Sequence, residues 1–278
     1  MIEQRATVQP AFACFRFCAL LFFTLWFAYG YVHQTYYNRA TPVSRLALMY
    51  SLFRHGTVCI DAYHEKTPDK AVWRGHYYSD KAPGTAVLCI PAFAAGIFMA
   101  KAFNIDPDSE PGWLLTSWMA CAFSISILTA LGGVACCLWL AKKVRWTAAL
   151  VSTLALFLGA APYPYATMMY SHAFVVALIA LALWAIDLET DASKLGFIWS
   201  FWPEMLVGYS LGFALASEFT AGLVIVGVGM YGISRKGWKR ALVGIVASIP
   251  PLLIIPLYNY SCFGSPLQLG YAHQATFD

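Results

Sequence analysis

Residues 113–140 read WLLTSWMACAFSISILTALGGVACCLWL and contain no charged side chain. As a helix this segment would be about 42 Å long, whereas a bilayer core of ~30 Å needs about 20 residues. The whole chain agrees, because 60% of its 278 residues are hydrophobic and only 12% are charged. A soluble domain carries about 25% charged residues. The sequence therefore predicts an integral membrane protein and excludes a soluble enzyme, a disordered chain and a coiled coil.

Six further apolar runs have the composition of membrane helices. They cover residues 12–32, 147–163, 173–186, 197–216, 220–233 and 242–258. With residues 113–140 they predict an all-α polytopic protein of about seven spans, forming a single transmembrane domain over residues 1–278. The first run also resembles a signal peptide, because Ala28-Tyr29-Gly30 could serve as a cleavage site, so that alternative stays open.

Two basic clusters set the expected orientation. Residues 142–145 and 235–240 are rich in Lys and Arg, and short loops of this kind face the cytoplasm. Four spans separate the clusters, an even number, so both clusters fall on the same side. Together with Arg5 and Arg16 they predict a cytoplasmic N-terminus. Residues 33–83 then form the first extracytoplasmic loop, and the tail after Tyr258 lies on that same outer side.

Residues 83–103 are apolar but less certain as a span. Pro91 interrupts the run and Lys101 lies near its end, and both features disfavour a complete crossing. We therefore expect a juxtamembrane or re-entrant helix at the outer surface. Eight spans remain the alternative.

Candidate chemistry gathers on the outer side of this topology. All six histidines fall there, four of them in the loop of residues 33–83. The plain explanation is that this loop is simply the one hydrated segment. Among the cysteines, only Cys59 and Cys262 lie in polar segments, and they are either a disulfide pair or two free thiols. The chain shows no Cys/His metal-ligand spacing, and its small net charge of +4 gives no sign of nucleic-acid binding.

The outer loop contains IDAYH at residues 60–64 and GHYYSDKAPG at residues 75–84. This pattern resembles the first outer loop of GT-C glycosyltransferases, the protein mannosyltransferase and aminoarabinose transferase-like enzymes, and is closest to bacterial members with the same GHYYSDKAPG loop. Residues 162–172 and 258–271 are also similar. The resemblance implies a GT-C fold in the bacterial cytoplasmic membrane, with a polyprenyl-phosphate-linked sugar as donor.

The resemblance and the chemistry of the individual residues together suggest a set of site residues. Lys81 corresponds to a family lysine that holds the donor phosphate, although a lysine at this depth could simply snorkel to the membrane surface. Arg45 and Arg74 are further candidates for the phosphate. The remaining candidate substrate-binding residues are His76, Tyr78, Asp80, His172 and Glu218.

The general base is where the sequence departs from the family. Family members place an acid shortly before the arginine, whereas residues 41–44 here read TPVS. We expect Asp61 to act as the catalytic base instead, with Asp69 and Asp80 as alternatives. Asp61 and His64 could also hold a divalent cation, but the spacing is too loose to assign metal ligands.

The sequence thus predicts a membrane enzyme that transfers a sugar from a polyprenyl-phosphate donor to an extracytoplasmic acceptor of unknown identity. Two alternatives remain: a non-catalytic membrane subunit or scaffold related to GT-C enzymes, and a transporter of lipid-linked precursors. GT-C enzymes usually have more spans, so the chain is either truncated or a short member that works with a membrane partner subunit. Expected partners are the lipid-linked sugar and membrane lipid.

Overall fold

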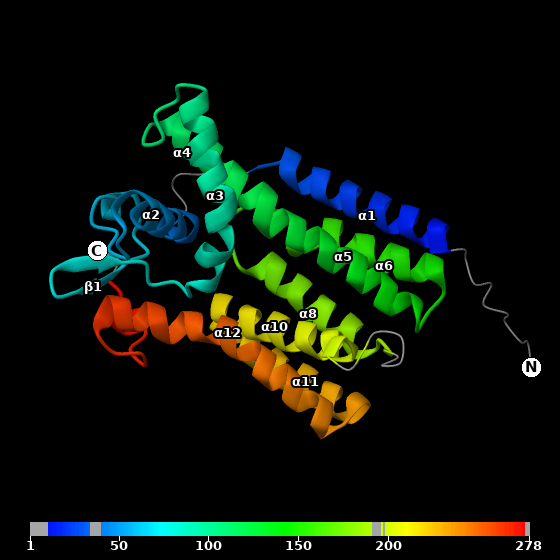
Figure 1. Cartoon of the computed structure of the whole chain (residues 1–278). Helices are drawn as coiled ribbons and strands as arrows, with labels where there is room; N and C mark the ends of the chain where they lie inside the picture. Colours follow the sequence, from blue (N-terminus) through cyan, green and yellow to red (C-terminus); the bar gives the residue numbers. More distant parts are fainter. Residues whose placement is uncertain (1–10, 34–39, 191–195, 197, 276–278) are drawn as a thin grey trace, which may run out of the picture.

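The computed structural model describes residues 11–33, 40–190, 196 and 198–275, and these residues are mostly helical (Figure 1). Arg5, used above for orientation, lies outside them. The helices are α1 (Ala11–Tyr31), α2 (Ala40–His55), α3 (Gly84–Ala102), α4 (Glu110–Ala120), α5 (Ser126–Ala141), α6 (Trp146–Gly159), α7 (Pro162–Ala166), α8 (His172–Ile186), α10 (Trp202–Ser217), α11 (Gly222–Lys236) and α12 (Trp238–Phe263). The strands are β1 (Ala71–Trp73) and β2 (His76–Tyr78).

Four of the described helices are long and apolar enough to cross a membrane: Cys14–Tyr31, Gly84–Ala102, Glu110–Ala141 and Trp238–Phe263. The third is continuous because a π-helical turn, Cys121–Ile125, joins α4 to α5. These helices confirm the prediction of a helical membrane protein. Helices α6, α8, α10 and α11 have only 14 to 16 residues, about 21–24 Å, so the number of complete crossings stays a prediction.

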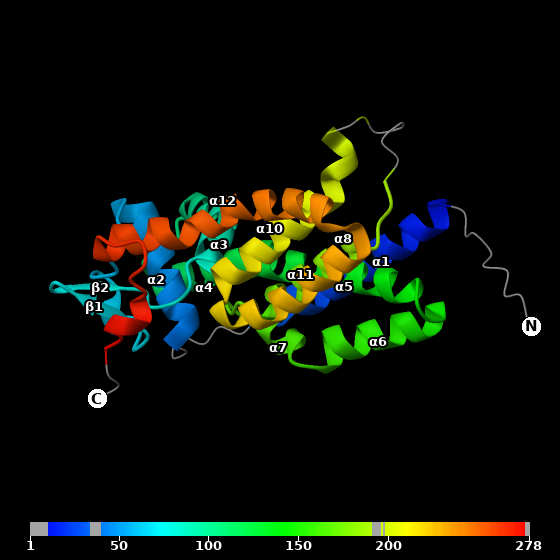
Figure 2. The same cartoon turned by 90° about the horizontal axis from the view of Figure 1, so that it is seen from below.

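Most of the helices form a bundle and share one direction. Figure 1 and Figure 2 show α1, α5, α6, α8, α10, α11 and α12 lying side by side along the long axis of the molecule. Leu25, Tyr29 and Phe157 are fully buried where α1, α5 and α6 meet. The Tyr29 hydroxyl donates a hydrogen bond to the Phe157 carbonyl oxygen (2.9 Å), which satisfies a polar group in an apolar interior.

Helix α3 differs from this bundle in direction. It runs steeply across the other helices and packs against α4 (Figure 1). Pro91 lies inside α3, yet the helix continues through it. The helix is therefore long enough to span a membrane but is not aligned with the bundle.

A small hairpin closes one end of the molecule. Strands β1 and β2 pair antiparallel, with Val72 opposite Tyr77. Arg74 and Gly75 form the turn between them, both at positive φ (51° and 82°), the conformation of tight hairpin turns. An isolated bridge between Ala71 and Gln274 attaches the C-terminal tail to β1. The first outer loop and the tail therefore form one unit.

Candidate functional site

The polar end of the molecule brings together five segments that are far apart in the sequence. We use "polar end" for residues 59–83, the N-terminal part of α2, residues 168–172, residues 217–220 and residues 258–274. The Tyr258 hydroxyl donates to the Ser79 carbonyl oxygen (2.8 Å), and the hydroxyls of Ser44 and Ser79 lie 2.8 Å apart. Gly270 packs so closely that a Cβ there would lie 3.0 Å from the Cα of Asp80.

Lys81 lies in this region as a paired cation. Its Nζ is 3.0 Å from Oδ2 of Asp69 and 3.2 Å from Oδ2 of Asp80. Its side chain is 13% exposed, and both aspartates are buried more deeply. The Thr41 hydroxyl also donates to Asp69 (2.6 Å), and the ring of Tyr271 lies 5.6 Å from the ammonium group. The expected phosphate ligand is therefore already neutralised by two carboxylates.

The electrostatics of this cluster follow from burial. Burial raises the pKa of Asp80, and Lys81 offsets only part of that effect. Burial alone would lower the pKa of Lys81, but the hydrogen bond to Asp69 and the charge of Asp80 outweigh it and raise the pKa above its ordinary value. Lys81 thus carries its proton throughout the physiological range.

Arg45 is a second buried cation, held by neutral groups. It lies on α2 with 4% of its surface exposed. Its Nη1 donates to the Met169 carbonyl oxygen (2.8 Å) and its Nη2 to the Ser171 hydroxyl (3.3 Å), while its Nε has no partner. Within the described part of the chain, no carboxylate contacts Arg45 directly.

Glu218 adjoins Arg45 through a single hydroxyl. The Ser171 hydroxyl that receives the Arg45 bond donates to Oε2 of Glu218 (2.6 Å). His172 Nδ1 lies 3.4 Å from the same oxygen, and the Thr220 hydroxyl donates to Oε1 (3.1 Å). The cation and the carboxylate, 173 positions apart in the sequence, thus belong to one network.

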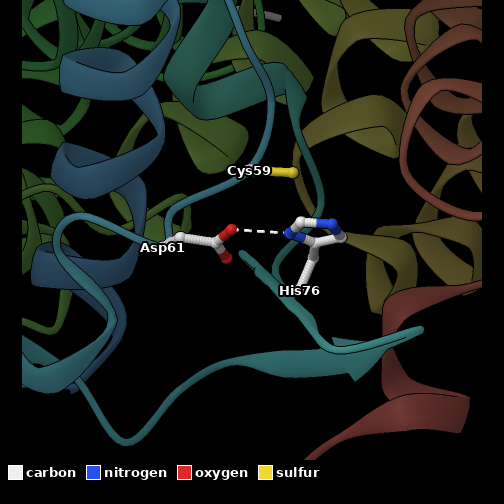
Figure 3. Close-up of side chains that lie close together, drawn as sticks. All are labelled: Cys59, Asp61 and His76. Carbon is white, nitrogen blue, oxygen red and sulfur yellow. Dashed lines mark hydrogen bonds and ion pairs between the residues drawn. The ribbon is translucent and has the colours of Figure 1, made fainter.

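Asp61 and His76 form a separate pair on the hairpin side. Oδ2 of Asp61 lies 2.7 Å from His76 Nδ1 (Figure 3), and Oδ1 accepts a hydrogen bond from the Tyr77 amide (2.7 Å). Burial raises the pKa of Asp61, but the Tyr77 N–H and His76 outweigh it and hold that pKa below its ordinary value. The side chains are 42% and 56% exposed. Among the described residues, the hydrogen-bond and ion-pair partners of Asp61 are His76 and the Tyr77 amide, not Lys81 or Arg45.

The expected partnership of Asp61 with His64 is not what the structure shows. His64 instead stacks on the ring of Tyr77, with centroids 3.9 Å apart and planes nearly parallel. Tyr78, expected at the substrate site, is buried and packs its ring against Phe263. Tyr77 and Tyr78 are neighbours on β2 and face opposite sides of the strand, so Tyr77 stacks on His64 whereas Tyr78 packs against Phe263.

Several contact residues of this region were missed by sequence reasoning. Ser171 and Tyr271 mediate contacts of Arg45, Glu218 and Lys81, and they occur at sequence separations of 47 residues or more from these partners. No local spacing signals such contacts. Ser171 and Tyr271 lie within residues 162–172 and 258–271, and the expected resemblance of these stretches to glycosyltransferases is the one sequence signal that points to them. Cys59 and Cys262, left open as a pair, are both free thiols.

The opposite end of the molecule carries the two basic clusters, residues 142–145 and 235–240, and we call it the basic end. Asp187 connects them, because its carboxylate lies 2.7 Å from Lys143 Nζ and 3.5 Å from Arg235 Nε. Glu204 pairs with Arg240 (2.7 Å). The prediction that both clusters share one side is therefore consistent with their positions (Figure 1).

An apolar cavity lies toward the basic end rather than at the polar end. Its volume is about 240 Å³, and it opens between α8, α10, α11 and α12. Glu204 and Lys236 supply its charged side chains. Lys81, Arg45 and Glu218 do not line it.

No family model, no curated protein and no solved structure matches this chain. Its site must therefore be interpreted from its own residues.

Proposed function

We propose that this chain is a GT-C type glycosyltransferase of the bacterial cytoplasmic membrane, with its site at the polar end. It transfers a sugar from a polyprenyl-phosphate donor to an extracytoplasmic acceptor. The sequence resemblance in residues 60–84 motivates the proposal. The membrane-length helices supply the environment that a lipid-linked donor requires.

One observation carries the proposal: Arg45 is a buried guanidinium that contacts only neutral acceptors within the described residues, beside the carboxylate of Glu218. A buried cation without a direct counter-ion favours the binding of an anion, because burying an unpaired charge is costly. A planar guanidinium also suits the oxygens of a phosphate. Arg45 is therefore a better phosphate ligand than Lys81, which two aspartates already neutralise.

The transfer step assigns a role to each group of the network. Glu218 accepts the proton of the acceptor hydroxyl while the oxygen of that hydroxyl bonds to the anomeric carbon of the sugar. The bond from that carbon to the phosphate oxygen breaks, and the electron pair leaves with the lipid phosphate. Arg45 stabilises the growing charge on the leaving phosphate. Lys81 positions Asp69 and Asp80 at the entrance to α3.

This assignment moves the proposed base from Asp61 to Glu218. Asp61 is engaged by His76 and the Tyr77 amide, and neither contact connects it to a cation of the Arg45 network. Glu218 shares the hydroxyl of Ser171 with Arg45, so acceptor and donor could be held together there.

A transfer assay with lipid-linked sugars tests these roles. We expect Arg45→Gln and Glu218→Gln each to lower the transfer rate at least about 100-fold, the range for loss of a general base or a charge-stabilising group. Glu65→Gln, an exposed acid of the same outer loop, should leave the rate within about twofold of wild type. Thermal melting in detergent establishes that each variant is folded.

The outcomes separate the alternatives. Loss of transfer in Asp61→Asn, with transfer retained in Glu218→Gln, would return the base to Asp61. The proposal would be contradicted if the wild-type chain transferred sugar from none of the donors tested. It would also be contradicted if the transfer rate were unchanged in both Arg45→Gln and Glu218→Gln.

A second candidate function, a non-catalytic membrane subunit that holds lipid, is favoured by the apolar cavity. That cavity is bounded by four helices, and Arg45, Ser171 and Glu218 do not line it. If the purified chain retains lipid but shows no transfer, this candidate replaces the enzyme.

A further inference from the structure

We propose that Cys59, Asp61 and His76 form a zinc-binding site on the hairpin side of the polar end. The ligand atoms of these three residues, one sulfur, one carboxylate oxygen and one imidazole nitrogen, all lie within 4.8 Å of one another. Figure 3 shows the carboxylate of Asp61 directed at the ring of His76, with the sulfur of Cys59 above them. The site is separate from the Arg45 network and does not depend on the proposed transfer reaction.

Backbone hydrogen bonds hold the three ligands in place. Cys59 forms an antiparallel bridge with Tyr78, and the Ile60 amide donates to the Tyr77 carbonyl oxygen (2.8 Å). The Tyr77 amide donates to Oδ1 of Asp61 (2.7 Å). The segment after α2 therefore lies beside β2, joined to it by one isolated bridge. Because the backbone already fixes both segments, metal binding needs only small rotations of side chains.

The donor set selects the metal. A thiolate, an imidazole and a carboxylate together suit Zn²⁺, whereas Mg²⁺ and Ca²⁺ prefer oxygen ligands alone. Tetrahedral zinc, with bonds of about 2.0–2.3 Å, places its ligands about 3.3–3.8 Å apart. The ligand atoms of Asp61 and His76, now 2.7 Å apart, must separate by about 0.6–1.1 Å to meet that requirement, and all three ligand atoms already lie within 4.8 Å of one another. Asp61 and His76 are about half exposed, so the fourth position is open to water.

Zinc would replace protons that the groups now carry. The 2.7 Å contact between Asp61 Oδ2 and His76 Nδ1 is a hydrogen bond that holds one proton on the ring nitrogen. On binding, the ring proton moves from Nδ1 to Nε2, Nδ1 gives its lone pair to the metal, and the thiol proton of Cys59 leaves to solvent. The charge of the ion is thus balanced by one thiolate and one carboxylate. No oxidation or reduction is involved.

The second thiol of the region is a natural control. Cys262 is buried in the cluster formed with Ala71, Tyr78 and Phe263, and it is not one of the three grouped ligands. A site built by Cys59 should therefore be indifferent to replacement of Cys262. His55, an exposed histidine at the end of α2, gives the matching control for His76.

Cobalt titration of the detergent-purified full chain, stripped with EDTA and kept reduced, tests the site. Co²⁺ reports its ligands through a thiolate-to-metal charge-transfer band in the near ultraviolet. We expect one Co²⁺ per chain, displaced by one Zn²⁺. Cys59→Ser should abolish the band, and Asp61→Asn or His76→Gln should weaken Zn²⁺ binding about 10-fold or more. Cys262→Ser and His55→Asn should bind as wild type does.

Size-exclusion profiles and thermal melts of each variant distinguish ligand loss from misfolding. A wild-type chain without the charge-transfer band would overturn the proposal. So would a band that survives Cys59→Ser, or one that disappears in Cys262→Ser.

Discussion

Lys81 is a partly buried, paired cation rather than the free phosphate ligand that its motif suggests. Its motif suggests a free cation at the membrane surface, but the ammonium lies between Asp69 and Asp80, both almost fully buried. Removing one member of a buried ion group leaves uncompensated charge, which costs about 3–5 kcal/mol, more than an exposed pair contributes. Lys81 is thus first a structural residue at the entrance to α3.

We therefore predict that Lys81→Met lowers the free energy of unfolding by about 3–5 kcal/mol. Denaturation in mixed micelles measures this change. The double variant Lys81→Met/Asp80→Asn should recover part of the loss, because one of the two unpaired carboxylates is gone. Lys101→Met, an exposed lysine at the end of α3, should change stability by less than about 0.5 kcal/mol. Equal stability of Lys81→Met and wild type would contradict the ion-cluster interpretation.

At the scale of elements, small residues set how closely the helices approach. A Cβ on Gly208 would lie 1.8 Å from the Gly244 carbonyl oxygen, and one on Gly212 would lie 2.7 Å from that of Ser248. These residues occur four positions apart on α10 and on α12, the small-xxx-small pattern of close helix pairs in membranes. The two backbones touch, and only the absence of a side chain permits it.

Gly208→Ala should consequently destabilise the protein by about 1–3 kcal/mol, because α10 and α12 must separate to admit the methyl group. Gly227→Ala provides the matched control on α11, since a Cβ there meets nothing within 4 Å and alanine favours helix. The melting temperatures of the two variants in detergent make the comparison. A Gly208→Ala variant as stable as Gly227→Ala would show that α10 and α12 do not pack as described.

Asp187 secures the ends of three helices at the basic end. Its carboxylate accepts bonds from Trp139 on α5 (3.0 Å) and Tyr231 on α11 (2.8 Å), and it pairs with Lys143. Burial raises the pKa of Asp187, but the hydrogen bonds and charges of these partners outweigh it and hold the pKa below its ordinary 3.8. The carboxylate is consequently stabilised in its charged form.

Asp187→Asn should lower the free energy of unfolding by about 1–3 kcal/mol at pH 7. A carboxyl whose folded pKa is depressed contributes stability above its unfolded pKa and loses it as pH falls through the folded value. The difference in the free energy of unfolding between wild type and Asp187→Asn should therefore disappear as the pH falls below about 4. Melting curves at pH 7 and pH 3 measure it. Glu189→Gln, which changes an exposed neighbour, should be as stable as wild type at both pH values. If the stability difference of Asp187→Asn were the same at both pH values, the charge of Asp187 would not be its cause.

At the scale of the whole molecule, the two ends differ in their chemistry. The hairpin, the tail and the Arg45 network occupy one end, and the basic clusters occupy the other (Figure 1, Figure 2). Helix α3 crosses the bundle direction instead of following it. If the bundle axis is the membrane normal, α3 lies close to the membrane plane, as expected for a juxtamembrane or re-entrant helix.

Reporter fusions distinguish seven spans from eight. In the seven-span prediction α3 does not cross the membrane, so alkaline phosphatase, which is active only outside the cytoplasm, should be active when fused after Gly75 and also after Asn104. The same reporter fused after Lys143 should be inactive, and a fluorescent reporter there should be bright. Opposite activities after Gly75 and Asn104 would mean that α3 crosses the membrane and that the chain has eight spans.

The sequence by itself determined the helical membrane character of this chain, because that property depends on local composition: a run such as residues 113–140 has no other stable environment. It also predicted that the two basic clusters lie at one end, because an even number of expected spans separates them. Only the tertiary structure decided which charges meet. His76 rather than His64 faces Asp61, and Ser171 joins Arg45 to Glu218. Such contacts arise from the packing of distant segments, which local spacing does not encode.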